Sequence, residues 1–430
     1  MVISKLWEYN MDTAVQERKV IADVPDGYKR TELGVIPKDW EIVEITDVTG
    51  LITDGAHLSP PTDKYGLPIA TVENLKNGSI DLESCRKISH EDFKRLVKGN
   101  CKPELGDVLV SKDGTIGISI TIEKKKDVVL LSSIALVRPL RDKIVSKYLS
   151  KSFSSDWFFK YLNKVKSGSA LKRIVLRDLR SYYFPLPPTL EEQQAIAEAL
   201  SDVDALIAEL NALIEKKQQV KKGAMQQLLT PNGSGQAGKK RLPGFDGEWE
   251  KKTLDEIGNT YNGLSGKSGA DFGDGNRSYI PFLNVMNNPV LDTSKFDTVK
   301  IKSGESQSTA EKGDLFFNTS SETPEEVGMC SVLLEDVENL HLNSFCFGFR
   351  LFDEKEVVPL FLAYYFRSQY GREHMKSLAQ GSTRYNLSKS KFINIEVALP
   401  SYIEQKAIAK IISDMDAEIQ ALQAKRSKYE

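Results

Sequence analysis

Apolar residues recur at helical spacing in two long stretches of the chain, residues 188–229 and 400–430. Apolar positions three and four residues apart lie on one face of an α-helix, so both stretches predict amphipathic helices. The first helix is expected to run to about Leu229, which makes it roughly 60 Å long. The apolar a and d positions of the predicted coiled-coil seam are Ile196, Leu200, Val203, Ile207, Leu210 and Ile214 in the first helix and Ile408, Ile412, Met415, Ile419 and Leu422 in the second.

The two predicted helices are copies of one segment. When Pro188 is aligned with Pro400, 11 of 20 positions are identical, among them Gln193 with Gln405. A repeat at a fixed offset indicates a duplicated structural unit. The chain therefore contains two related halves, each of which ends in a long helix.

Both helix starts match the capping-box pattern. Thr189 is followed by Glu192, and Ser401 is followed by Glu404, each three residues later. In a capping box two otherwise unpaired donors of the first turn are satisfied reciprocally. Each helix is therefore predicted to begin just after its proline.

Charge is distributed in the same way along both helices. Acidic residues of 191–204 give way to lysines of 216–222, and acidic residues of 404–416 give way to basic residues of 425–428. An antiparallel arrangement would place acidic starts beside basic ends, so we expect an antiparallel pair. A solvated charge pattern that carries no pairing information is the alternative.

The rest of the chain also repeats, in a looser form. Short runs of strand-forming residues alternate with turn residues, which is typical of β-structure. We predict an α+β fold with a pseudo-two-fold repeat, in which two β-rich globular domains are separated by two long antiparallel helices that form a coiled coil. The parallel segments are 37–48 with 246–258, 68–74 with 281–287, 105–111 with 312–318, and LSSIALV with LNSFCFGF.

Domain boundaries follow from this repeat and from a Gly/Ser-rich linker. When the repeats are aligned, the second helix stops about a dozen residues before the first. The chain is short by nature, it has been trimmed, or another segment completes the pair. The weakly periodic N-terminal segment is the candidate for that role. The predicted parts are an N-terminal helical segment at 1–26, a first domain at 27–187, a central long helix at 188–230, a linker at 231–243, a second domain at 244–399 and a C-terminal helix at 400–430.

The composition is that of a globular protein with no global attraction to nucleic acid. Of 430 residues, 40% are apolar and 27% charged, and the net charge is −2 with a pI near 6.2. The chain shows neither the pattern of a signal peptide nor an apolar run of membrane-spanning length, so we expect a cytoplasmic protein without membrane contacts. The four cysteines and four histidines are scattered, which favours buried or idle thiols over a zinc site.

Each half ends in a basic stretch that contains glycine and serine. Residues 141–180 hold 11 Lys or Arg against three Asp, with the aromatic residues Trp157, Phe158, Phe159 and Tyr161 interleaved. A less basic stretch closes the second half, and a Gly-Ser dipeptide lies at the same place in both. A solvated helix face explains one such stretch as well as a DNA site does. Its recurrence in both halves favours DNA.

Glycine-rich loops in the chain match catalytic motifs only in part. The stretch NGLSGKSG at residues 262–269 lacks the first glycine of a P-loop, because Tyr261 stands there, and no apolar helix follows it. The chain has no Asn/Asp-Pro-Pro-aromatic tetrapeptide of a methyltransferase and no acidic cluster with lysine for a metal-dependent nuclease. We therefore expect no catalytic residues and no metal site.

The order of these elements resembles that of the specificity subunits of type I restriction-modification systems. The resemblance is carried by LPPTLEEQQAIA and LPSYIEQKAIA at the helix starts, by GDVLVSKDGTIG and GDLFFNTSSETPEEVG in the two domains, and by GYKRTELGVIPKDWEIV at residues 27–43. It covers nearly the whole chain, and the duplicated helix start is its most specific element.

This resemblance implies a non-catalytic reader of double-stranded DNA, in which each domain binds one half of a bipartite, asymmetric site. The long helices would set the spacing of the half-sites and dock two modification subunits, which bind S-adenosylmethionine and methylate adenine. Restriction subunits, which use ATP and Mg, would join for translocation and cleavage. The chain itself would hold no cofactor. A coiled-coil scaffold that joins proteins without touching DNA is the alternative function.

The candidate DNA contacts are polar and basic side chains near the two Gly-Ser dipeptides and in one turn. Arginine and lysine bind phosphates, arginine also reaches guanine edges, and hydroxyl groups bind phosphate oxygens. The candidates are Lys112 (in the turn SKDG), Ser169, Lys172, Arg173 and Arg177 in the first domain, and Ser382, Arg384, Asn386, Lys389 and Lys391 in the second.

Overall fold

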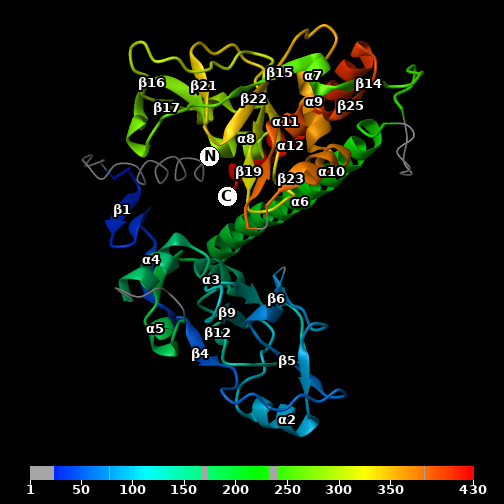
Figure 1. Ribbon diagram of the computed structural model, residues 1–430. Coiled ribbons are helices and arrows are strands. Elements are labelled where there is room, and N and C mark those ends of the chain that lie inside the picture. Colours follow the sequence, from blue (N-terminus) through cyan, green and yellow to red (C-terminus); the bar gives the residue numbers. More distant parts are fainter. Residues whose placement is uncertain (1–23, 77, 166–172, 232–240, 382) are drawn as a thin grey trace. The chain divides into compact units, whose positions relative to one another are not determined.

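The chain forms two compact units, Met1–Ala205 and Leu206–Glu430, and the division falls inside one long helix. The computed structural model describes residues 24–76, 78–165, 173–231, 241–381 and 383–430 (Figure 1). Nearly all of the predicted N-terminal helical segment and most of the predicted linker therefore lie outside the described residues. Within the described ranges, no helix combines the length and the apolar character needed to cross a membrane.

The first domain, residues 24–187, is built on a four-stranded antiparallel sheet and a smaller mixed sheet. The larger sheet has the order β10-β9-β12-β4, with bounds Ser119–Thr121, Val108–Ser111, Ile134–Pro139 and Thr49–Asp54. In the smaller sheet β5 pairs in parallel with β11 and antiparallel with β8, with bounds Leu67–Ala70, Val129–Leu130 and Arg86–Ile88.

Helices and short strand pairs complete the first domain. The helices are α2 (His90–Lys98), α3 (Ser146–Ser152), α4 (Asp156–Val165) and α5 (Leu176–Arg180). The remaining strand pairs are β1 with β2 (Tyr28–Thr31, Gly34–Pro37), β6 with β7 (Leu75–Lys76, Ser79–Ile80) and β3 with β13 (Glu41–Glu44, Tyr183–Leu186).

The second domain, residues 241–399, repeats this topology. Its larger sheet has the order β15-β22-β18-β20, with bounds Gly258–Asn262, Cys346–Leu351, Leu315–Asn318 and Cys330–Val332. Its smaller sheet is β17-β16-β21 (Asp297–Val299, Phe272–Ile280, Leu340–Leu342), again with one parallel and one antiparallel pair. β14 with β25 (Glu250–Thr253, Glu396–Leu399) matches β3 with β13.

The last three helices of the second domain follow the same order along the chain as α3, α4 and α5 of the first. The helices of this domain are α7 (Leu254–Ile257), α8 (Phe282–Asn287), α9 (Pro359–Arg367), α10 (Gln369–Leu378) and α11 (Lys389–Phe392). The short strands β19, β24 and β23 (Ser320–Ser321, Tyr385–Leu387, Ala379–Gln380) form an additional sheet. The predicted α+β fold with a duplicated β-rich domain is therefore confirmed.

One of the aligned segments of the repeat was placed in the wrong register. Parallel pairing sets Ala70 beside Leu130 and Ile280 beside Leu342, so Ala70 and Ile280 are equivalent. Residues 71–74 consequently match residues 281–284. The alignment of residues 68–74 with residues 281–287 is therefore wrong by three residues. Backbone pairing decides this register, because the local sequences are too different to fix it.

Alternate residues of the central strands face two separate cores. In the first domain Val108 and Val110 pack with α3, α4, α5 and the start of the long helix, while Leu109 packs with the smaller sheet. In the second domain Phe317 and Phe316 divide in the same way. Because successive side chains of a strand point to opposite faces, a strand buried on both sides is apolar throughout.

The same ion-pair clamp closes one end of the central sheet in both domains. Arg138 binds both carboxylate oxygens of Asp107 at 2.8 and 2.9 Å, and Arg350 binds both of Asp314 at 2.8 and 2.7 Å. The hydrogen bond to the carboxylate raises the pKa of each arginine. Bidentate pairs of this kind are strong and directional, so the clamps fix the turns that lead into β9 and β18.

A buried glutamine anchors each long helix to its own domain. The helices are α6 (Leu190–Leu228) and α12 (Tyr402–Ser427). The side-chain oxygen of Gln193 accepts a hydrogen bond from Val145 N at 2.9 Å, and its amide nitrogen donates to the carbonyls of Lys143 and Pro187. Gln405 makes the equivalent three bonds, to Val358 N at 2.9 Å and to the carbonyls of Glu356 and Pro400.

Only half of each predicted capping box forms. The hydroxyls of Thr189 and Ser401 accept hydrogen bonds from the backbone of the glutamates three residues later. Those glutamates do not reach back, because Glu192 accepts from the indole of Trp40 at 3.0 Å and Glu404 binds Arg241 at 2.7 and 2.9 Å. Each glutamate therefore ties its helix to the domain in place of completing the cap.

The second part of α6 runs antiparallel to α12, as the charge pattern predicts. Asn211 lies beside Arg426 (3.1 Å), Lys217 beside Glu418 (2.6 Å), and Lys221 is paired with Asp416. Residue numbers rise along one helix as they fall along the other. Two late lysines of α6 therefore neutralise Glu418 and Asp416 of α12.

The predicted seam is only partly an interface between the two helices. Ile196 packs against the core of the first domain, and Ile408 and Ile412 belong to the core of the second. Leu200 is 45% exposed, so its assignment to a buried seam is wrong. The apolar face of each helix start packs against the domain, because the buried glutamine holds that part of the helix on the domain. The seam residues that are fully buried are Leu210, Ile214, Ile408, Ile412 and Ile419, and those that are half-buried are Ile196, Val203, Ile207, Met415 and Leu422.

Gln405→Leu should lower the free energy of unfolding of the second domain by about 2 to 4 kcal/mol, because one amide and two carbonyls lose their buried partner. The exposed residue Gln420 provides a matched control on the same helix. Chemical denaturation of both variants tests the effect. Equal stability of Gln405→Leu and Gln420→Leu would show that the buried amide does not anchor α12.

Candidate nucleic-acid interface

The two basic stretches pass the end of the same central strand in both domains. Arg173 forms an isolated antiparallel bridge with Asp113, which follows β9, and Asn386 of β24 pairs with Ser320, which follows β18. The next residues, Ile174 and Leu387, are both buried, which fixes the chain. Arg173 and Asn386 are thus equivalent positions, and both are exposed.

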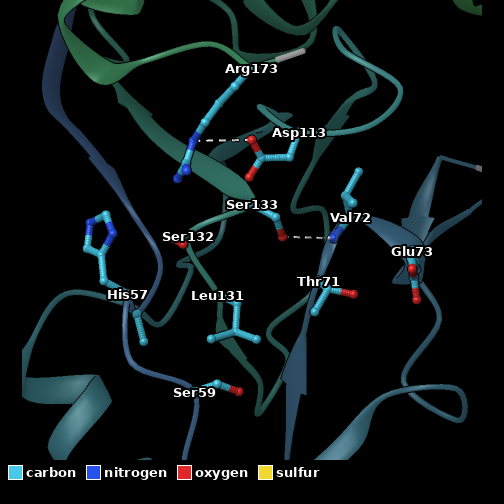
Figure 2. A pocket seen from close by; sticks show the side chains of 11 residues that line it. His57, Ser59, Thr71, Val72, Glu73, Asp113, Leu131, Ser132, Ser133 and Arg173 are labelled. Atoms are coloured by element: carbon cyan, nitrogen blue, oxygen red, sulfur yellow. Dashed lines mark hydrogen bonds and ion pairs between the residues drawn. The ribbon is translucent and has the colours of Figure 1, made fainter.

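A hollow of about 410 Å³ lies beside Arg173 in the first domain (Figure 2). It is formed where the loops after β4, β5 and β9 and the loop before β12 meet. Most of the residues that line it are polar, and the guanidinium of Arg173 lies 3.2 Å from Asp113. Residues that line it include His57, Ser59, Thr71, Glu73, Asp113, Ser133 and Arg173. Hydrogen-bonding groups in a surface hollow of this kind can bind a base edge or a phosphate.

Arg177 adds a second exposed cation four residues after Arg173. Its side chain is 87% exposed on the short helix α5 and lies 3.4 Å from the carboxylate of Asp178. An exposed pair contributes little to stability, so the guanidinium is free to turn toward a ligand. Arg173 and Arg177 keep their assignment as candidate DNA contacts.

Lys112 does not fit the predicted role of a surface DNA contact. Its side chain is only 2% exposed, and its ammonium is paired with the buried carboxylate of Asp54. His57 lies 3.3 Å from the other oxygen of Asp54. In the turn SKDG the aspartate is half-buried and the glycine is exposed, whereas the lysine points inward, where its ammonium compensates the buried carboxylate of Asp54.

In the second domain, Arg384 and Lys391 are exposed, whereas Lys389 is half-buried. The ammonium of Lys389 donates to the side chain of Asn262, and burial lowers the pKa of Lys389. Asn262 ends β15 as Asp54 ends β4, so a lysine meets the same strand end in both domains. Arg384, Asn386 and Lys391 are thus the candidates most open to DNA.

Three predicted site residues, Ser169, Lys172 and Ser382, lie outside the described residues. The aromatic residues of the first basic stretch mostly have a different role from the one their position suggested. Phe158 and Tyr161 are buried in the core and pack on Tyr182 at ring distances of 4.9 and 5.4 Å. They support the domain and do not present stacking faces to DNA.

Sequence reasoning missed the residues that the loops before β12 and β22 display. Ser133 lines the hollow of the first domain, and Phe345 occupies the equivalent position of the second, since both carbonyls accept a backbone bond from the residue after β9 or β18. The repeat of LSSIALV with LNSFCFGF points to this region, but only the backbone pairing shows that Ser133 corresponds to Phe345, and only the fold shows that Phe345 is exposed. Leu283, on α8, was missed because its register was wrong.

The glycine-rich loop after β15 does not form a phosphate-binding loop. The ammonium of Lys267 lies 2.6 Å from Glu305 and donates to the carbonyl of Lys300. The hydrogen bond from Lys267 lowers the pKa of Glu305 to about 2. Only the 3-10 turn Gly269–Asp271 follows the loop, so no helix N-terminus faces a phosphate.

Cysteines and acidic residues show no arrangement suited to metal chemistry in the part of the chain that the structure describes. All four cysteines are buried and free. Burial raises the pKa of the Cys85 thiol to about 11 and that of Cys101, Cys330 and Cys346 as well. The described residues contain no group of three or more His, Cys, Asp or Glu side chains able to hold a metal ion.

A model of the type I restriction modification DNA specificity domain matches residues 37–222 and again residues 246–428. The chain belongs to this family. The two matched ranges each contain most of one domain and of the long helix that follows it, in agreement with the duplicated fold. The assignment gives no support to the alternative of a coiled-coil scaffold that does not bind DNA.

Relatives in two organisms cover nearly the whole specificity chain. A protein of Methanocaldococcus jannaschii named among the type I restriction enzyme specificity subunits (MjaX) is 29% identical over 432 residues, which cover 94% of this chain and 93% of the relative. The type I restriction enzyme EcoKI specificity subunit of Escherichia coli K12 is 23% identical, with 89% of this chain and 83% of the relative covered.

A solved structure has the same fold. The crystal structure of the type I restriction-modification system S subunit from M. genitalium covers 91% of this chain and 92% of its own, with a TM-score of 0.55 and 16% sequence identity. At this level of identity the likeness concerns the fold alone. It supports the arrangement of two β-rich domains and two long helices in the specificity chain.

Lys112→Met should destabilise the first domain by about 3 kcal/mol or more, because Asp54 would keep its charge in the interior without its lysine. The double variant Lys112→Met with Asp54→Leu removes both charges and should recover much of this loss. Thermal unfolding of the two variants checks the prediction. If the single variant were as stable as the unmodified chain, the buried pair would not hold the strand ends together.

Proposed function

We propose that this chain is the non-catalytic subunit that selects the DNA sequence for a type I restriction-modification complex. Each domain reads one half of a bipartite, asymmetric site. The observation that carries the proposal is that exposed polar side chains recur beside the end of the same strand, at Arg173 and at Asn386, in two copies of one fold. A duplicated scaffold with different surface residues suits two unlike half-sites.

The paired helices support a role as a spacer. Reading faces about one turn of B-DNA apart, roughly 34 Å, add their binding energies only when the connection between them is stiff. α6 is one uninterrupted helix of 39 residues, and α12 braces its second part through salt bridges. We propose that this pair sets a constant gap between the half-sites.

The repeat also suits two copies of one partner. Equivalent helix starts, each anchored by a buried glutamine, give the chain approximate two-fold symmetry, so it can dock two modification subunits through similar surfaces. S-adenosylmethionine would be bound by those subunits, which methylate adenine, and ATP with Mg by the restriction subunits.

Expression of the chain with its modification subunit in a methylation-free host should place methyl groups on adenines within a split sequence of constant gap. Mapping of modified adenines across the host genome provides the test, with the modification subunit alone as the control. Methylation without any bipartite motif would contradict the proposal. Retention of the complex on DNA should also fall steeply with salt, which a scaffold that does not bind DNA would not show.

Arg384→Ala should weaken binding of the complex to its site by about 1 to 3 kcal/mol. If Arg384 reads a base, the sequence preference relaxes at one position. If it holds a phosphate, binding weakens uniformly and the salt dependence becomes shallower. Lys425→Ala, which removes one exposed cation from α12, serves as the control. Unchanged affinity and preference in Arg384→Ala would remove this residue from the interface.

A further inference from the structure

An aromatic side chain is held out from a rigid turn beside the candidate contacts of the second domain. Phe345 is 55% exposed, yet its backbone is fixed by three hydrogen bonds. Its N–H donates to the side chain of Asn343 at 2.8 Å, and its carbonyl accepts from the backbone and the hydroxyl of Thr319 at 2.9 and 2.7 Å. A firm backbone under an exposed apolar side chain is pre-organised for contact with a ligand.

The equivalent position of the first domain has the opposite chemistry. Ser133 is held by the same backbone bond, from Lys112 N to its carbonyl at 2.8 Å. Its hydroxyl turns to the neighbouring loop and accepts from Val72 N at 3.2 Å (Figure 2). The scaffold therefore does not require an aromatic residue here, and Phe345 is not explained by folding.

A second pair of equivalent positions shows the same contrast. Leu283, on the first turn of α8, is 67% exposed. The matching residue of the first domain is Glu73, which lines the hollow beside Arg173. The backbone of Ile280, just before α8, bonds to Asn343 at 3.2 Å, so Leu283 and Phe345 come from neighbouring chain segments. Two large apolar side chains are thus exposed where the first domain presents polar ones.

Asn386 lies on a segment that is joined to the segment of Phe345 through one shared residue, Thr319. The backbone of Thr319 bonds to Phe345 on one side and to Leu387 on the other, at 2.9 and 2.8 Å. Asparagine pairs with the two hydrogen-bonding groups on the major-groove edge of adenine, and apolar side chains contact the methyl group of thymine. Both preferences select the same base pair.

We infer that the second domain reads an A·T pair, with Phe345 and Leu283 against the thymine methyl group and Asn386 toward the adenine. This inference rests on the proposed function and adds to it the base class and the residues that distinguish the two half-sites. In the first domain Ser133 and Glu73 stand at the apolar positions, so its half-site is read without this methyl contact.

Phe345→Ala should make the complex much less sensitive to one thymine methyl group. The probes are duplexes that carry the bipartite site found by methylation mapping, in which each thymine is replaced in turn by deoxyuridine. When the chain carries no substitution, loss of one buried methyl group from the DNA should weaken binding of the complex about three- to tenfold at that position. The Phe345→Ala complex should lose most of this difference between the thymine and deoxyuridine duplexes there, since only Leu283 remains against the methyl group, and should respond like the complex with the original chain at thymines elsewhere.

Phe352→Ala is the matched control. Phe352 is 59% exposed and directly follows β22, whereas Phe345 directly precedes it, so the two phenylalanines flank opposite ends of one strand. Phe352→Ala should keep the full response to deoxyuridine. The inference is overturned if no thymine position loses its methyl sensitivity in Phe345→Ala, or if Phe352→Ala loses the same sensitivity. Absence of any bipartite site would instead contradict the proposed function.

Discussion

Firm attachment of each long helix to its own domain is the constraint on which the rest of the structure depends. One buried glutamine per helix, Gln193 or Gln405, satisfies one amide and two carbonyls of the adjoining domain. Buried polar groups without partners are costly, so this bonding allows little freedom in how the helix leaves the domain. A helix that leaves its domain in a fixed direction can hold a constant spacing. One that swivels cannot.

The neighbouring glutamates strengthen this attachment in two different ways. Glu192 accepts from Trp40, whereas Glu404 is held bidentately by Arg241 and is almost fully buried. The position is the same in both repeats, and only the partner has changed. Both halves thus keep a glutamate that attaches the helix to its domain, although the residue that binds this glutamate differs.

The surfaces that face a ligand have diverged much further than the scaffold. The clamps of Asp107 and Asp314 agree to within a tenth or two of an ångström, because they close equivalent turns. At the other end of the central strands, Ser133 corresponds to Phe345 and Arg173 to Asn386. Loops on a fixed scaffold tolerate such exchanges, since their side chains are not needed for packing. Two domains that read unlike half-sites require a common scaffold with different surface residues.

Periodicity and repetition in the sequence determined the architecture. The apolar spacing of residues 188–229 predicted a helix that the structure bounds at Leu190–Leu228, and the duplicated helix start predicted two related domains. The charge pattern predicted that the two helices are antiparallel, and the structure pairs Lys221 with Asp416. These features are local or repeat at a fixed offset, so a single chain reveals them without knowledge of the tertiary contacts.

Tertiary structure alone decided which side chains face outward at the strand ends. Lys112 and Arg173 both look like surface cations in the sequence, but a buried carboxylate at Asp54 draws one inward, and the other stays at the rim of the hollow. Phe158 and Phe345 are both aromatic residues near candidate DNA contacts, yet one lies in the core and the other is exposed. Burial depends on neighbours that are distant in the chain, so local composition determines the elements and their order, while the fold determines which residues a ligand can reach.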